Sequence, residues 1–378
     1  MSQNIKKIDI KDLLKKFTLN NTNSYSTEKG EVNKTNSHIE NINIDSPQFE
    51  ADGLIKENID QVLPKSVQDE LDEIGITPDE LGEMIHFDSI TIDDIESITD
   101  CGSNGENKKI VINLVGRYYG GYEEEFDKVE VFLTKENGEY IVSSIKFSDG
   151  TTIQCNLSES RKQKIRDSIG LSEDVEIKGY SVLGIKGQRV PVYWNVDSLR
   201  GFKSFLDGVK EALNLYPSSA LNRVLDSGHF KGIFYGTHRD APDGMDKDEN
   251  WAAFALKDEY IYYNAGAGLE FSTHYITHEF AHLLDRAMGP NGVTSRFSVE
   301  DVKFKKIYEK YKKQFQQAFD DRIGYNSYSF PEGIPIVEEF FAEVVSIYLQ
   351  YPEELESLFP DLYEYVDDIM HGREVKEW

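Results

Sequence analysis

The chain has 378 residues, enough for two domains, and its 41 basic and 68 acidic side chains give a formal net charge of −27. This acidity argues against binding to nucleic acid or to anionic membranes, because both attract basic surfaces. No apolar run is long enough to span a bilayer, and the N-terminus lacks the apolar core of a secretory signal. We therefore expect a cytoplasmic, virion-associated or non-classically delivered protein.

Residues 1–62 are expected to form a disordered tail. From residue 18 onward this stretch is rich in Asn, Ser, Thr, Lys and Glu and has few large apolar side chains, so it cannot build a core. Between Ile5 and Phe17, apolar residues alternate with lysines, which predicts a short basic amphipathic helix. This helix would dock the chain to an assembly or delivery partner; the alternative is a frayed terminus.

Residues 63–160 are expected to form a small α+β module. Two short capped helices come first, at Ser66–Ile74 and Thr77–Ile85. Four strand-like runs follow and predict an antiparallel sheet: Lys109–Tyr119, Phe126–Thr134, Glu139–Phe147 and Thr151–Asn156. We find no catalytic pattern here, so a binding or positioning module is the natural interpretation.

The chain has two cysteines, Cys101 and Cys155, and both fall in this module. They could form a disulfide, but two free thiols in a reducing compartment are the favoured interpretation. A linker is expected near residues 157–175, so that a second domain covers residues 170–378. This domain should contain strands within Val175–Val190, a helix at Asp197–Tyr216, a buried strand at Phe230–Tyr235, and a hairpin formed by Trp251–Leu256 and Glu259–Asn264.

A helical run that begins near Ser272 or Thr273 and stops at Gly289-Pro290 contains the sequence H-E-x-x-H, as His278-Glu279-Phe280-Ala281-His282. Residues four apart share a helix face, so the two imidazoles can bind one zinc ion, and Glu279 can act as general base for its water. The alternative is a helix with two incidental histidines. His274 lies one turn earlier and is expected to be solvated, with a role beside the site as the alternative.

A hydrolytic zinc site takes three protein ligands and leaves one position open. Asp285 is too near in sequence to be the most natural third ligand, and we expect it to partner a ligand histidine instead. A second amphipathic helix, Val337–Tyr348, carries Glu339 and Glu343 on one face. The spacing leaves open whether this face points inward or toward solvent.

The pair of motifs H-E-F-A-H and E-E-F-F-A-E resembles the catalytic domain of anthrax lethal factor and its relatives, the Pro-Pro endopeptidases included. The resemblance covers roughly residues 195 to 370 and implies a zincin fold. It implies that His278, His282 and Glu339 bind zinc and that Glu279 is the catalytic base. Asp285 also matches a family position, and Ala281 replaces the usual glycine. Glu343, one turn after Glu339, can accept a hydrogen bond from a ligand histidine.

The family also places a catalytic tyrosine roughly seven residues before the ligand glutamate, where its hydroxyl stabilises the oxyanion. Glu332 occupies that position here. A short insertion, residues 332–335, would restore Tyr328 to this role, and Tyr325 is the alternative.

These patterns together predict an α+β chain whose C-terminal half is a zincin-like metallopeptidase domain. The expected activity is zinc-dependent endopeptidase cleavage of a protein or peptide through a zinc-activated water, in a toxin or phage-associated effector. An extended substrate would pair with an edge strand, for which Trp251–Ala255 is the candidate, with an ordinary core hairpin as the alternative. The alternative is a non-catalytic zincin-fold binding or structural module within a larger toxin or phage assembly, which need not hold zinc.

Overall fold

The computed structural model of the chain describes residues 66–87, 89–102, 106–118, 122–242, 253–256, 259–265, 273–290, 295–319 and 336–373. Residues Leu63–Trp378 form one compact unit, and the predicted tail over residues 1–62 lies outside the described residues. The helices described include none that is both long and apolar enough to cross a membrane.

Within the described residues, ten strands form one sheet in the order β1-β2-β3-β4-β5-β6-β7-β8-β10-β9. Neighbouring strands are antiparallel, except that β7, β8 and β10 run parallel to one another. The strands are β1 Ile95–Asp100, β2 Asn107–Tyr118, β3 Tyr122–Glu136, β4 Glu139–Phe147, β5 Thr152–Gln154, β6 Gly179–Ile185, β7 Gln188–Trp194, β8 Gly232–Gly236, β9 Ala253–Leu256 and β10 Tyr260–Asn264.

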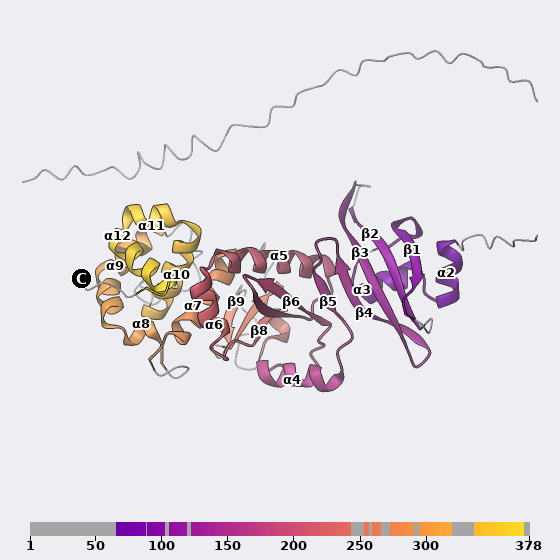
Figure 1. Cartoon of the computed structure of the whole chain (residues 1–378), viewed down its shortest axis with the longest axis horizontal. Coiled ribbons are helices and arrows are strands. Elements are labelled where there is room, and N and C mark those ends of the chain that lie inside the picture. Colours follow the sequence, from indigo (N-terminus) through magenta and orange to yellow (C-terminus); the bar gives the residue numbers. More distant parts are fainter. Residues whose placement is uncertain are drawn as a thin grey trace, which may run out of the picture. The chain divides into compact units, whose positions relative to one another are not determined.

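Helices surround this sheet and continue beyond it toward the C-terminus (Figure 1). They are α2 Val67–Ile74, α3 Pro78–Ile85, α4 Glu159–Ile169, α5 Leu199–Leu215, α6 Ser218–Leu225, α7 Thr273–Ala287, α8 Phe297–Glu300, α9 Val302–Phe319, α10 Val337–Gln350, α11 Pro352–Leu358 and α12 Pro360–Met370. The described residues therefore form a mixed helix-and-sheet fold, as the sequence predicts.

The two N-terminal helices begin where their capping residues predict. Ser66 caps α2 and Thr77 caps α3. The side chain of each accepts from the backbone N–H of the acidic residue three positions later, whose carboxylate accepts from the backbone N–H of the capping residue. The strands β2 to β5 match the four predicted runs, whereas β1 was not predicted. Its sequence, I-E-S-I-T-D, is short and has acidic residues at two of six positions, so its apolar alternation is weak.

The sheet does not end with the N-terminal module, which corrects the expectation of a small separate sheet. The three-residue strand β5 pairs with β4 on one side and with β6 on the other. The Ser181 hydroxyl donates to Thr152 O at 2.9 Å and reinforces this junction. The backbones come so close that a Cβ at Gly179 would lie 2.7 Å from Gln154 O. The division at residues 160–170 stays a prediction.

The stretch 157–175 is not the extended linker that we expected, because it contains α4. Ile165 and Ile169 lie one turn apart and are buried in a small apolar cluster. Arg166 donates from Nε to Val175 O at 2.7 Å, which ties the helix to the segment that follows. The sequence of α4, E-S-R-K-Q-K-I-R-D-S-I, is mostly polar and charged, so its few apolar residues did not predict a helix.

The parallel strands are covered on both faces. On one face, α5 stacks Phe202 on Trp194 and Phe205 on Tyr235, with ring centroids 5.0 and 4.5 Å apart. On the other face, Phe234 and Tyr262 stack at 5.2 Å and belong to the cluster that includes α4. This double cover explains why β8 and β10 read as nearly continuous apolar runs.

The predicted hairpin is present as the antiparallel pair β9 and β10. Among the described residues, β9 ends the sheet order and contacts α7. The role of residues 253–255 as the substrate-binding edge stays a prediction. Trp251 lies outside the described residues.

The C-terminal helices gather around α10 (Figure 1). Nine consecutive residues of α10, from Phe340 to Tyr348, are buried. Aromatic rings of α9 pack against it: the ring centroid of Phe304 lies 5.3 Å from that of Phe341, and the ring centroid of Phe315 lies 5.2 Å from that of Phe340. A polar side chain within this buried stretch, such as that of Glu343, is therefore closely surrounded by protein.

Both cysteines are free thiols, as favoured by the sequence. Cys101 follows β1 and Cys155 follows β5. Burial raises the pKa of the Cys155 thiol to about 12. This thiol therefore stays protonated at neutral pH and is a poor nucleophile.

Candidate active site

The helix α7 places His278 and His282 on one face, one turn apart, with ring centroids 4.9 Å apart. Its opposite side is anchored in the core. Phe280 is fully buried and packs edge-on against Tyr216 at 4.9 Å, and the Tyr216 hydroxyl donates to Thr277 O at 2.5 Å. These contacts fix the rotation of α7, so both imidazoles point toward α10.

Glu339, in the first turn of α10, meets the two histidines. Its carboxylate oxygens lie 3.3 Å from His278 Nε2 and 3.5 Å from His282 Nε2, and the two Nε2 atoms are 3.2 Å apart. A tetrahedral zinc ion with bonds of about 2.0–2.2 Å holds its ligand atoms roughly 3.3–3.6 Å apart. The two Nε2 atoms and the Glu339 carboxylate, whose Oε2 faces His278 and whose Oε1 faces His282, are therefore spaced much as zinc ligands are, so these residues fit the metal.

The ionisation of these groups is strongly coupled. Burial alone would lower the pKa of His278, but the carboxylates of Glu343 and Glu339 raise it well above the usual value. Burial alone would raise the pKa of Glu339, yet the two imidazoles hold it far below its usual range. A cation at this point is thus stabilised by its surroundings, as a metal site requires.

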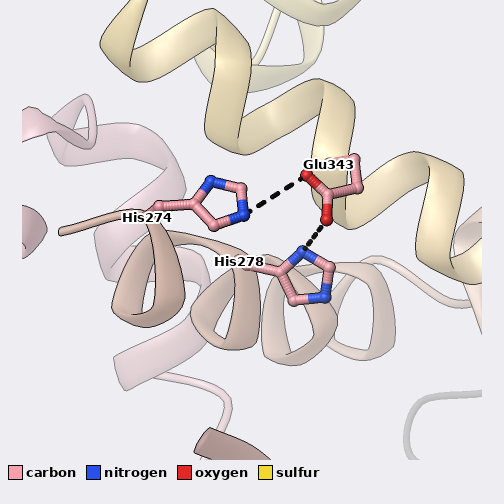
Figure 2. A group of neighbouring side chains, drawn as sticks. All are labelled: His274, His278 and Glu343. Atoms are coloured by element: carbon pink, nitrogen blue, oxygen red, sulfur yellow. Dashed lines mark ion pairs between the residues drawn. The ribbon is translucent and has the colours of Figure 1, made fainter. Parts of the chain in front are cut away.

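Glu343, one turn after Glu339, is buried and faces the other nitrogen of His278 (Figure 2). The distance from Glu343 Oε1 to His278 Nδ1 is 3.0 Å. A carboxylate at Nδ1 favours a proton there and leaves the Nε2 lone pair free for a metal. Burial alone would raise the pKa of Glu343, but the imidazoles of His278 and His274 lower it to about 2.

Glu279 lies between the two histidines in sequence and faces β9. Its carboxylate accepts a hydrogen bond from Ala255 N–H, in the edge strand. Burial raises its pKa, the imidazoles of His278 and His282 lower it, and the net shift is upward. The candidate base therefore sits at the junction of α7 and the strand that we expect to bind substrate.

Asp285 is fully buried, and its contacts differ from those predicted. Its carboxylate accepts hydrogen bonds from Ser298 N–H at 2.6 Å and from the Ser298 hydroxyl at 2.7 Å. Gly289, just after α7, lies very close to the segment that leads into α8: a Cβ at this position would lie 2.2 Å from Ser295 O. Asp285 therefore ties α7 to α8, while His282 Nδ1 is buried with no hydrogen-bond partner among the described residues.

His274 is not the solvated histidine that we expected. Its side chain is 15% exposed, and its Nε2 lies 3.5 Å from Glu343 Oε2 (Figure 2). Sequence analysis also missed the polar residues behind it, Thr277, Ser346 and Gln350, which hydrogen-bond to one another between α7 and α10. Ser346 interrupts the apolar run V-V-S-I-Y, and this serine could have indicated a buried polar group on the helix.

Tyr328 and Tyr325, the candidates for the oxyanion role, lie outside the described residues. The same holds for Ser272, whereas α7 begins at Thr273, the other predicted start. The other predicted site residues come together around α7 and α10, although they are separated by a long stretch of sequence.

Over residues 265–371 the chain is similar to a known family, described as glucose-regulated metallo-peptidase M90. This range contains both motifs, the helix α7 and the helix α10. No curated protein matches the chain. The match supports a metallopeptidase, and the cluster of His278, His282 and Glu339 is a group that could bind its metal.

Proposed function

We propose that this chain is a zinc-dependent endopeptidase, with His278, His282 and Glu339 as the ligands. The observation that carries the proposal is the convergence of the two Nε2 atoms, 3.2 Å apart, with the Glu339 carboxylate, whose oxygens lie 3.3 Å from His278 Nε2 and 3.5 Å from His282 Nε2. Two neutral imidazoles and one carboxylate suit zinc and leave a fourth position for water or substrate. The similarity to a metallopeptidase family over residues 265–371 supports the same activity.

When bound, zinc supplies a Lewis acid for the scissile carbonyl and lowers the pKa of the attacking water. Glu279 accepts the proton of that water and delivers it to the leaving amine. The hydrogen bond from Ala255 N–H orients the carboxylate of Glu279. Glu343 holds the ring of His278 through Nδ1, so that Nε2 stays directed toward Glu339 and His282.

The substrate would bind as an extended strand along the outer edge of β9. This strand has β10 on one side and ends the sheet order within the described part of the chain. Backbone hydrogen bonds to an edge strand hold a peptide with little dependence on its side chains. Because β9 contacts α7, a peptide bound there runs past Glu279 and the ligand cluster.

Two finer parts of the proposal rest on the resemblance to anthrax lethal factor and its relatives. Tyr328, with Tyr325 as the alternative, would stabilise the oxyanion together with the metal. The setting, as a toxin or phage-associated effector, follows from the same resemblance.

The test combines metal analysis with cleavage of a peptide library. Protein purified without added metal should contain about one zinc per chain and should cleave a defined subset of peptides. Glu279→Gln should keep the zinc and lose cleavage by several orders of magnitude, because the ligands remain while the proton acceptor is gone. Stoichiometric zinc without cleavage of any peptide would favour the binding module instead, and an absence of zinc would reject the site.

A further inference from the structure

His274 and its neighbours are not used by the proposed reaction, yet they are built into the site. Glu343 has two carboxylate oxygens and a side chain that is only 8% exposed. Oε1 faces His278 Nδ1, whereas Oε2 is buried and lies 3.5 Å from His274 Nε2 (Figure 2). A buried carboxylate oxygen is unfavourable without a donor. His274 is therefore placed to stabilise the half of Glu343 that does not face the ligand.

The other nitrogen of His274 is tied to a polar chain between α7 and α10. Ser346 Oγ lies 3.0 Å from His274 Nδ1 and 2.7 Å from Thr277 Oγ1. Gln350 Nε2 donates to Ser346 Oγ at 2.9 Å and to Thr277 Oγ1 at 3.2 Å. Thr277 and Ser346 are fully buried. The ring of His274 is thus held by its neighbours on both helices.

The contacts of the two ring nitrogens favour a proton on Nε2 of His274. If Ser346 donates to Nδ1, a neutral imidazole has its proton on Nε2, which points at Glu343. The opposite tautomer would direct the Nε2 lone pair at a carboxylate, which is repulsive. A doubly protonated ring also carries a proton on Nε2. Each arrangement that avoids repulsion therefore directs an N–H of His274 toward Glu343.

We propose that His274 is a positioning residue, which holds the carboxylate of Glu343 so that its other oxygen orients the ring of His278. The proposal rests on the proposed function, because it takes His278 as a metal ligand. The line of contacts runs from Ser346 through His274 and Glu343 to His278. Outer partners of this kind set how tightly a ligand histidine holds its metal.

The same three side chains, His274, His278 and Glu343, could also be considered as a second metal site. Two observations favour the positioning role. The distance of 3.0 Å between His278 Nδ1 and Glu343 Oε1 suits a shared proton and is shorter than the roughly 3.3 Å that a tetrahedral ion imposes on its ligands. A second ion would also require both nitrogens of His278 as ligands, which a neutral imidazole cannot supply.

The experiment measures how fast zinc leaves the full-length protein in the presence of excess chromogenic chelator. His274→Leu should release zinc about tenfold faster than the unchanged chain, because Glu343 is no longer held. His274→Gln should restore slow release, because its amide N–H can reach the place of Nε2. The double variant with Glu343→Gln should be no faster than Glu343→Gln alone, because His274 acts through Glu343.

The melting temperature of each chelator-treated variant separates positioning from a loss of fold. If His274→Leu does not fold, Ser346→Ala takes its place, with faster release expected in the same direction. Unchanged release in His274→Leu, or rate increases that multiply in the double variant, would overturn the proposal. Two zinc ions per chain would replace it with the second metal site. If the unchanged chain holds no zinc at all, it is the proposed function that fails.

Discussion

Glu338 and Glu339 are adjacent in sequence but face different partners. Glu338 Oε1 lies 3.4 Å from Arg296 Nε, whereas Glu339 Oε2 lies 3.3 Å from His278 Nε2. Successive residues of a helix are rotated by about 100°, so only one of the two can face the histidines. The pair is therefore a matched test of the third ligand.

Replacing Glu339 should weaken metal binding strongly, whereas replacing Glu338 should leave it nearly unchanged. Glu339→Ala removes a ligand and should weaken zinc binding by orders of magnitude. Glu338→Ala removes a partly exposed ion pair and should change zinc affinity by no more than about twofold. Competition with a chromogenic chelator measures both. Release of zinc by Glu338→Ala in place of Glu339→Ala would mean that a different face of α10 points at α7.

Asp285→Ala should destabilise the fold without removing the metal. The substitution leaves the buried Ser298 N–H and hydroxyl without their acceptor, at a cost of about 3 kcal/mol in the free energy of unfolding. Urea denaturation of the chelator-treated protein measures this loss, and zinc titration supplies the control. Normal stability combined with weak zinc binding would show that Asp285 acts on His282 instead.

The stability of the chain should fall in mild acid because of His86. Burial lowers the pKa of His86, nearby Lys178 lowers it further, and Asp197 and Glu176 oppose the shift only in part. The unfolded chain therefore binds the proton more readily, and folding stability is lost as the pH falls below about 6.5. Urea denaturation at pH 7 and at pH 5 measures the loss.

The matched variant for His86 is His86→Asn. His86 has a positive φ of 56°, a backbone conformation that asparagine tolerates well. The variant will lose the ring contact with Trp194, so its stability at pH 7 should drop. Its decrease between pH 7 and pH 5 should nevertheless be smaller than that of the unchanged chain. Equal decreases would place the acid sensitivity elsewhere.

Removing residues 1–62 should leave the remaining chain folded, with zinc binding and cleavage of short peptides retained. Residues Leu63–Trp378 form a compact unit of their own. The composition of the removed stretch also argues against a contribution to the core. Thermal melting and zinc content of the truncated protein test this. A melting temperature lower by more than about 10 °C would indicate that the removed residues stabilise the fold.

Local patterns in the sequence were enough to predict the elements that carry the site. The helix period places His278 and His282 on one face whatever surrounds them. Capping residues marked the starts of α2 and α3, and two neighbouring strand-like runs marked the hairpin of β9 and β10. These features depend on residues a few positions apart, so the amino-acid sequence by itself determined them.

Contacts between distant segments were decided only by the tertiary structure. Spacing could not tell whether Glu339 and Glu343 point inward, because that depends on how α10 is rotated against α7. Nor could it place His274 beside Glu343, Asp285 on Ser298, or β5 beside β6. The burial of a polar side chain depends on the partner that compensates its desolvation, and in each of these cases the partner lies on another element.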